Sequence, residues 1–169
     1  MRYGIINKFV LLVIAIMVAG STAYAAEEET KLSKETTFLY DMGVINSYSP
    51  EATVTKQAVQ NSIEMLGFAQ TVTKFFNSND YTEPVTFAEA AAVLADLTGR
   101  GALLTKDNVI TIAAQAGIID GVNLGANDYV TMECYVKMLY AALNADLMEA
   151  KFVGDQVTYS ISRGKSYLS

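Results

Sequence analysis

The chain has 169 residues, 12 basic and 18 acidic side chains, one cysteine and no histidine. Its formal net charge of −6 argues against nucleic acid and against an anionic membrane surface as partners. Without histidine, Ser-His, Cys-His and His-metal chemistries are excluded, and Cys134 has no internal disulfide partner. We therefore expect a core held by packing, and a protein that is not an enzyme and carries no cofactor.

Residues 1–25 have the pattern of a secretory signal peptide. Arg2 and Lys8 make its start basic, an apolar run follows, and Ala23-Tyr24-Ala25 offers small residues for cleavage. The apolar run is shorter than the roughly 20 residues that a membrane-spanning helix needs. We predict export and no stable membrane span after cleavage. The alternative is an uncleaved N-terminal anchor.

Residues 26–36 are polar and predict a flexible leader. Three repeats then follow, at residues 37–67, 68–101 and 102–146, each with a short helix, a polar loop and a longer helix that begins at a Val-Thr pair. Threonine at a helix start caps free backbone N–H groups, and apolar residues recur 4, 8 and 11 positions later, on one helix face. The pairs are Val54-Thr55, Val85-Thr86 and Val130-Thr131. The pattern predicts an all-α fold.

Glycines mark where several of these helices end. Gly117 can take the left-handed conformation that closes a helix, and Thr98-Gly99-Arg100-Gly101 ends the long helix of the second repeat. The second repeat is the most degenerate, with an expected first helix at residues 68–76. In the tail, residues 147–169, apolar and polar residues alternate from Val157 to Ser162, which predicts a strand. Its partner is either a short strand near Phe152 or a following domain.

Two of the glycines that end helices, and all three Val-Thr pairs that begin helices, lie in motifs that resemble those of a known family. The residues are Gly43-Val44-Ile45 with Val54-Thr55-Lys56-Gln57-Ala58, then Val85-Thr86-Phe87-Ala88-Glu89, then Gly117-Ile118-Ile119-Asp120-Gly121 with Val130-Thr131-Met132-Glu133-Cys134. Together they resemble S-layer homology modules, over roughly residues 35–145. The resemblance implies a pseudo-threefold helical bundle that binds secondary cell-wall polysaccharide at the surface of a bacterial, Gram-positive type envelope.

The family motif at the helix start is Thr-Arg-Ala-Glu, in which arginine reaches an acidic sugar. A guanidinium suits that task because it offers a fixed fork of donors to a carboxylate. Here the arginine positions hold Lys56, Phe87 and Met132, so one copy keeps a cation. The resemblance therefore implies one polysaccharide site in the groove beside Lys56, with Tyr48 as the remnant of the family's aromatic loop.

Each candidate residue also has a purely structural interpretation. Thr86 and Glu89 form a capping-box pattern, which starts a helix well in any protein. Lys56 fits a solvated surface lysine, and Arg100, a candidate ligand contact, fits a cation at a helix end. The candidate ligand-binding residues are Tyr48, Thr55, Lys56, Thr86, Glu89, Arg100 and Thr131. No metal site is expected, because turn formation explains Asp80 and Asp128 in their Asn-rich loops.

The first functional hypothesis is an exported, non-catalytic protein that anchors to the bacterial surface by binding wall polysaccharide. The second is a structural or protein-interaction module without a sugar site, which self-associates or binds a surface protein. The third is the anchoring end of a truncated larger surface protein. In all three, the expected location is outside the cell and associated with its wall.

Overall fold

The computed structural model describes residues 32–68 and 73–169. The predicted signal peptide and residues 26–31 of the predicted leader lie outside the described residues. Every helix and strand that the structure describes lies within the unit Ser33–Ser169. No helix in the described part of the chain is long and apolar enough to cross a membrane.

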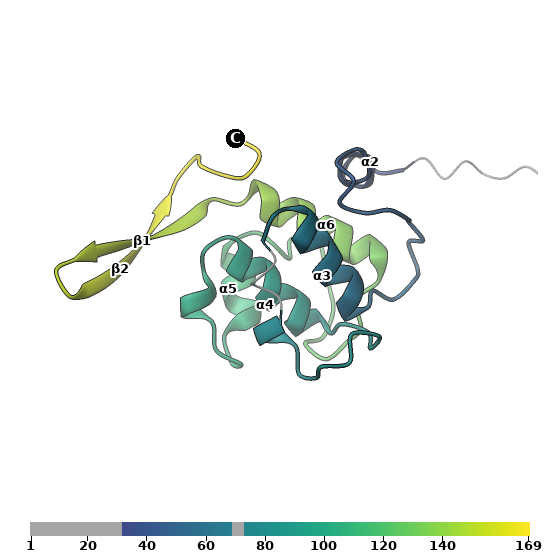
Figure 1. Ribbon diagram of the computed structural model, residues 1–169, viewed down its shortest axis with the longest axis horizontal. Helices are drawn as coiled ribbons and strands as arrows, with labels where there is room; N and C mark the ends of the chain where they lie inside the picture. The colour runs from purple at the N-terminus through teal and green to yellow at the C-terminus, as the bar shows by residue number, and fades with distance from the viewer. Residues whose placement is uncertain (1–31, 69–72) are drawn as a thin grey trace, which may run out of the picture. The chain divides into compact units, whose positions relative to one another are not determined.

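The unit Ser33–Ser169 combines helices with one small sheet (Figure 1). In chain order its elements are α2 (Lys34–Asp41), α3 (Lys56–Met65), the 3-10 helix η1 (Thr73–Phe75), α4 (Phe87–Leu97), the 3-10 helix η2 (Gly101–Leu103), α5 (Val109–Gln115), α6 (Met132–Asn144), β1 (Leu147–Val153) and β2 (Gln156–Ser162). The all-α, pseudo-threefold helical bundle expected from the sequence is therefore wrong as the fold class. The described residues form a mixed structure with five α-helices and a two-stranded antiparallel sheet.

The predicted strand in the tail pairs within the chain. β1 and β2 form an antiparallel hairpin in which Phe152 lies opposite Val157, so the alternative of a strand near Phe152 is the observed one. The connecting residues are Gly154 and Asp155, and Gly154 has a φ of 61°. A two-residue turn with glycine at its first position matches the right-handed twist of paired strands. This turn closes the hairpin.

The three Val-Thr pairs meet in a closed ring of backbone hydrogen bonds. The N–H of Val54 donates to the carbonyl of Val130 at 2.9 Å, that of Val130 to Val85 at 3.1 Å, and that of Val85 to Val54 at 2.8 Å. The three valine side chains are at most 1% exposed. Each following threonine is the N-cap of α3, α4 or α6, as the sequence predicted. The repeated pair thus has a structural cause: the valine backbone forms the ring while its side chain is buried, and the threonine caps the helix.

α4 is the most deeply buried helix, because nine of its 11 residues are buried. It packs against α5, α6 and both 3-10 helices. Ala90, Ala91 and Ala95 have no exposed surface, and such small side chains let neighbouring elements approach closely. α4 therefore forms the centre on which the candidate site is built.

The end of α4 is tied to the tail. Gly99 has a φ of 84° directly after the cap residue Thr98, in line with the predicted stop. The carbonyl of Thr98 accepts a 2.9 Å hydrogen bond from the N–H of Met148 in β1. A Cβ on residue 99 would lie 2.2 Å from the carbonyl oxygen of Met148, so only glycine fits this crossing.

Two helices differ from their predicted extents. α2 begins at Lys34, inside the segment predicted as leader, because the Ser33 side chain caps it by accepting from the N–H of Thr36. Of the helix predicted at residues 68–76, the described part contains only the three-residue η1, and residues 69–72 lie outside the described residues.

Candidate functional site

A cleft of about 460 Å³ lies beside the first turns of α4. Its walls come from η1 and the residues that follow it, from α4, and from the segment that leads into α5. The lining residues are Lys74, Phe75, Phe76, Asn77, Ala88, Glu89, Ala92, Leu104, Thr105, Lys106 and Val109. This volume is within the range of pockets that bind small molecules in proteins.

The lining combines apolar surface with two cations. Phe75 and Phe76 are half-buried and pack against the core. Lys74 is exposed, lies 3.0 Å from the Asp96 carboxylate and sits over the Phe75 ring at 4.8 Å from its centre. Lys106 is exposed and makes no ion pair with another described residue. An aromatic wall beside exposed ammonium groups suits an anionic ligand that also has an apolar face.

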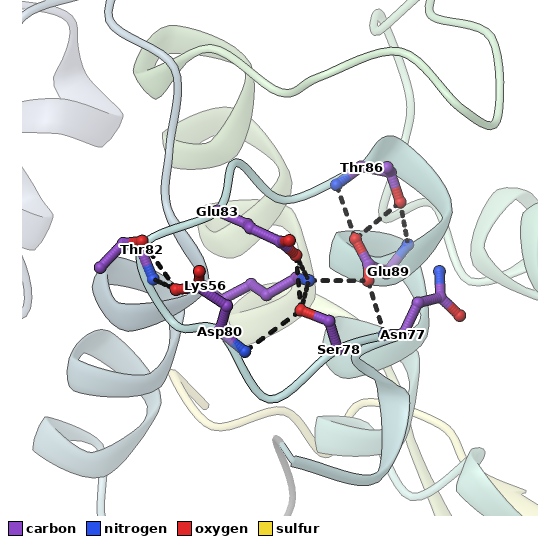
Figure 2. A network of polar contacts seen from close by, with 8 residues as sticks. All are labelled: Lys56, Asn77, Ser78, Asp80, Thr82, Glu83, Thr86 and Glu89. Carbon is purple, nitrogen blue, oxygen red and sulfur yellow. Dashed lines mark hydrogen bonds and ion pairs between the residues drawn. The ribbon is translucent and has the colours of Figure 1, made fainter.

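A polar network underlies one wall of this cleft (Figure 2). The Lys56 side chain is only 3% exposed, so its interpretation as a solvated surface lysine is wrong. Its ammonium donates to Glu83 at 2.7 Å and to the Ser78 hydroxyl at 3.0 Å, and lies 3.7 Å from Glu89. An ammonium has three N–H donors, and Ser78, Glu83 and Glu89 lie around it, so none of the donors is left for a ligand. Lys56 thus holds the loop after η1 against α4.

Glu89 is the acceptor that connects the network to the cleft. Its two oxygens accept from the N–H of Asn77 at 2.8 Å, and from the N–H and hydroxyl of Thr86, each at 2.9 Å. The N–H of Glu89 donates in return to the Thr86 hydroxyl, which completes the predicted capping box. Both Asn77 and Glu89 line the cleft. The helix cap therefore also fixes the backbone of the cleft wall.

The charges in the network stabilise one another. Burial alone would lower the pKa of Lys56, but the hydrogen bond from its ammonium to Glu83 and the charges of Glu89, Glu83 and Asp80 raise this pKa above its usual value. Burial raises the pKa of Glu89, but the N–H groups of Asn77 and Thr86, the Thr86 hydroxyl and Lys56 together lower it. The hydrogen bonds from Lys56 and Ser78 likewise lower the pKa of Glu83. All three groups are charged at neutral pH.

Of the sequence-predicted residues, the structure brings Lys56, Thr86 and Glu89 together, and only Glu89 lines the cleft. The remaining four, Tyr48, Thr55, Arg100 and Thr131, line no part of this cleft. Tyr48 is half-buried against the core, and Thr55 and Thr131 cap α3 and α6.

Arg100 is 5% exposed and donates to the Thr98 hydroxyl at 2.7 Å and to the Asp146 carbonyl at 2.9 Å. Burial lowers its pKa, and the charge of Asp146 opposes that effect. Its observed contacts join the end of α4 to the start of the tail.

The other arginine positions of the family motif are also enclosed: Phe87 is 2% exposed, and Met132 is half-buried against the core.

Sequence reasoning missed the cleft itself. Lys74-Phe75-Phe76 is a basic-aromatic run that could have drawn attention, but Leu104-Thr105-Lys106 gives no signal of a site. The loop carboxylates behave as turn formers. Asp80 accepts from the N–H and hydroxyl of Thr82, and Asp128 accepts from the N–H of Gly125. Among the residues with a described placement, no group of three or more Cys, Asp or Glu is arranged to hold a metal ion.

Comparison with known proteins gives no match to a family model, to a curated protein or to a solved structure. The features that bear on function are therefore the chemistry of the cleft and the residue patterns of this chain.

Proposed function

We propose that this chain is an exported, non-catalytic protein of a bacterial cell envelope that binds an acidic wall polysaccharide. The observation that carries the proposal is the cleft beside α4, where Phe75 and Phe76 provide an aromatic wall and Lys74 and Lys106 provide cations. Sugar rings present apolar C–H faces that pack on aromatic side chains, while lysine ammonium groups attract carboxylates as point charges.

The sequence supports the same class of ligand. The signal-like residues 1–25 favour export, and the three motif sets that resemble S-layer homology modules favour secondary wall polysaccharide as the target. The proposed contacts differ from those that the resemblance implies, because the Lys56 ammonium is already engaged by Ser78, Glu83 and Glu89. In this chain Lys56 supports the wall of the cleft, and Lys74 and Lys106 contact the ligand.

A second candidate function is a protein-interaction module that lacks a sugar site. The burial of Lys56 and Phe87 favours it, because neither side chain at these two arginine positions is free to bind a ligand. This alternative predicts that the chain binds proteins and does not bind wall polysaccharide.

The test is co-sedimentation of residues 26–169 with purified cell-wall sacculi, before and after extraction of their secondary polysaccharide. The proposal predicts binding that is lost on extraction. Lys106→Glu reverses one charge in the cleft and should weaken binding at least ten-fold, which corresponds to about 1.4 kcal/mol. Lys34→Glu is the matched control, because Lys34 is an exposed lysine on α2, outside the cleft.

Absence of binding to untreated sacculi would refute the polysaccharide function. An equal loss in Lys34→Glu and Lys106→Glu would show that binding depends on net charge rather than on the cleft, and would refute the proposed site.

A further inference from the structure

One face of the β1–β2 hairpin is apolar and exposed. Successive side chains of a strand point to opposite faces, so the pairs Met148–Ile161, Ala150–Tyr159 and Phe152–Val157 share one face. The other face carries mainly polar side chains, among them Glu149, Lys151, Thr158 and Ser160. On the apolar face Phe152 is 76% exposed, Ile161 53%, Val157 45% and Tyr159 41%. Exposed apolar surface of this kind is typical of an interaction site.

The outer edge of β2 is open and unprotected. β2 has the sequence QVTYSIS, without a charged residue or proline, and within the described residues no other strand pairs with it. β1 differs, because it carries Glu149 and Lys151 and its Met148 N–H already donates to Thr98. Natural proteins protect edges with charges and prolines, since open edges pair with other strands.

The outward backbone groups of β2 belong to the residues of the apolar face. In a hairpin with a two-residue turn, the two residues next to the turn form two hydrogen bonds with each other; here they are Val153 and Gln156. Along the strands, such hydrogen-bonded pairs alternate with pairs whose N–H and C=O groups point outward. The N–H and C=O groups of Val157, Tyr159 and Ile161 therefore point away from β1. The same three residues offer backbone hydrogen bonds and apolar side chains to one partner.

We infer that the occupant of this edge is a second copy of the chain, whose β2 pairs antiparallel with this β2 about a two-fold axis at Tyr159. Such pairing places Tyr159 opposite its own copy and Val157 opposite Ile161 of the second copy, on both sides of the axis. A two-fold interface uses the same patch on both partners, and these pairs are self-complementary without any like-charge contact. The product is a four-stranded sheet with one continuous apolar face.

The size of the contact predicts a weak dimer. Side chains of this size present roughly 150–250 Å² each when free, so the exposed fractions of the four large residues correspond to about 400 Å² per copy. Edge pairing sets the two apolar faces side by side, so two copies bury only part of this area, well below the ~1,200 Å² that separates weak from standard interfaces. The backbone hydrogen bonds between the two β2 strands supply most of the contact. Dimers should therefore form at high protein concentration and dissociate on dilution.

The test is sedimentation velocity of residues 26–169 from about 10 µM to about 1 mM, a range that brackets weak association. The unmodified chain should shift from monomer to dimer. Tyr159→Lys should remain monomeric at every concentration, because it places two ammonium groups opposite each other on the axis. Gln156→Lys adds the same charge at an exposed position that lies opposite Ser162 of the second copy, so the two new charges are far apart. This variant should dimerise like the unmodified chain.

A cross-link tests the register. In a Cys134→Ser background, Tyr159→Cys should form a disulfide between copies under mild oxidation. An opposed pair that exchanges both ladder hydrogen bonds has Cα atoms about 5.5 Å apart, within the range that a disulfide spans. Gln156→Cys lies opposite Ser162 of the second copy and should not cross-link. A monomer at all concentrations, or equal cross-linking of both variants, would overturn the inference. The cleft variant Lys106→Glu should dimerise normally, so this result is independent of polysaccharide binding.

Discussion

Replacing Lys56 by methionine tests whether the buried network holds the cleft wall in place. Methionine keeps a chain of similar length and removes the ammonium, which leaves Glu83 and Glu89 without their shared cation. Glu83 is 49% exposed, so water can replace the lost contact there. Glu89 is 5% exposed and becomes a buried carboxylate without a counter-ion.

The expected loss follows from what Glu89 retains. Breaking a buried ion pair by removing one partner typically costs about 3–5 kcal/mol. Glu89 keeps its hydrogen bonds from Asn77 and Thr86, and its separation from the Lys56 ammonium is a long 3.7 Å. We therefore expect the low end of that range, about 3 kcal/mol in the free energy of unfolding.

Urea unfolding at pH 7, followed by circular dichroism, measures this loss. Lys137→Met is the matched control, because Lys137 pairs with Glu133 at 2.6 Å but both side chains are about half exposed. An exposed pair contributes up to about 0.5 kcal/mol on a helix, so the control should change little. Equal losses in the two variants would refute the argument, since burial would then not determine the cost.

The pH dependence gives an independent test of the same network. The pKa of Glu89 and that of Glu83 are lowered in the folded state, so their contribution is fully present above the unfolded value of about 4.3 and is lost as pH falls through the folded pKa. In Lys56→Met the part of this contribution that depends on Lys56 is already missing. The difference in stability between the two proteins should therefore stay constant at neutral pH and shrink as pH falls below about 4.3, and a difference that grows there would contradict the assignment.

Two further substitutions and one control test contacts that define the fold. Gly99→Ala should lower the free energy of unfolding by about 3 kcal/mol, because it combines the cost of a positive φ with a clash against the Met148 carbonyl. Gly121→Ala has a similar φ but free space around it, so thermal unfolding should show a loss of only about 1–2 kcal/mol. Tyr135→Phe removes the buried hydrogen bond between α6 and Ser62 of α3, and chemical unfolding should report a loss of about 1 kcal/mol.

Helix caps and helix ends could be predicted from the sequence, whereas the packing of distant segments could not. The caps at Thr55, Thr86 and Thr131 and the stop at Gly99 depend on neighbouring residues, so their patterns predicted them correctly. The all-α class failed because β1 gives a weak strand signal: Glu149, Ala150 and Lys151 in its centre are depleted in strands.

The site was missed for a different reason. The burial of Lys56 depends on Ser78 and Glu83, which lie 22 and 27 residues further along the chain. The cleft likewise exists only because the segment after η1 and the segment before α5 pack on the same helix. Neither arrangement produces a local sequence pattern, whereas helix caps and turns do.

The most direct test of the central claim is a titration of isotope-labelled residues 26–169 with acidic oligosaccharides released from cell walls, followed by amide chemical shifts. Binding in the cleft predicts saturable shifts confined to residues 74–77, 88–92 and 104–109, and their loss in Lys106→Glu. Shifts centred on Tyr48 or on the hairpin, or no shifts at high oligosaccharide concentration, would contradict the account.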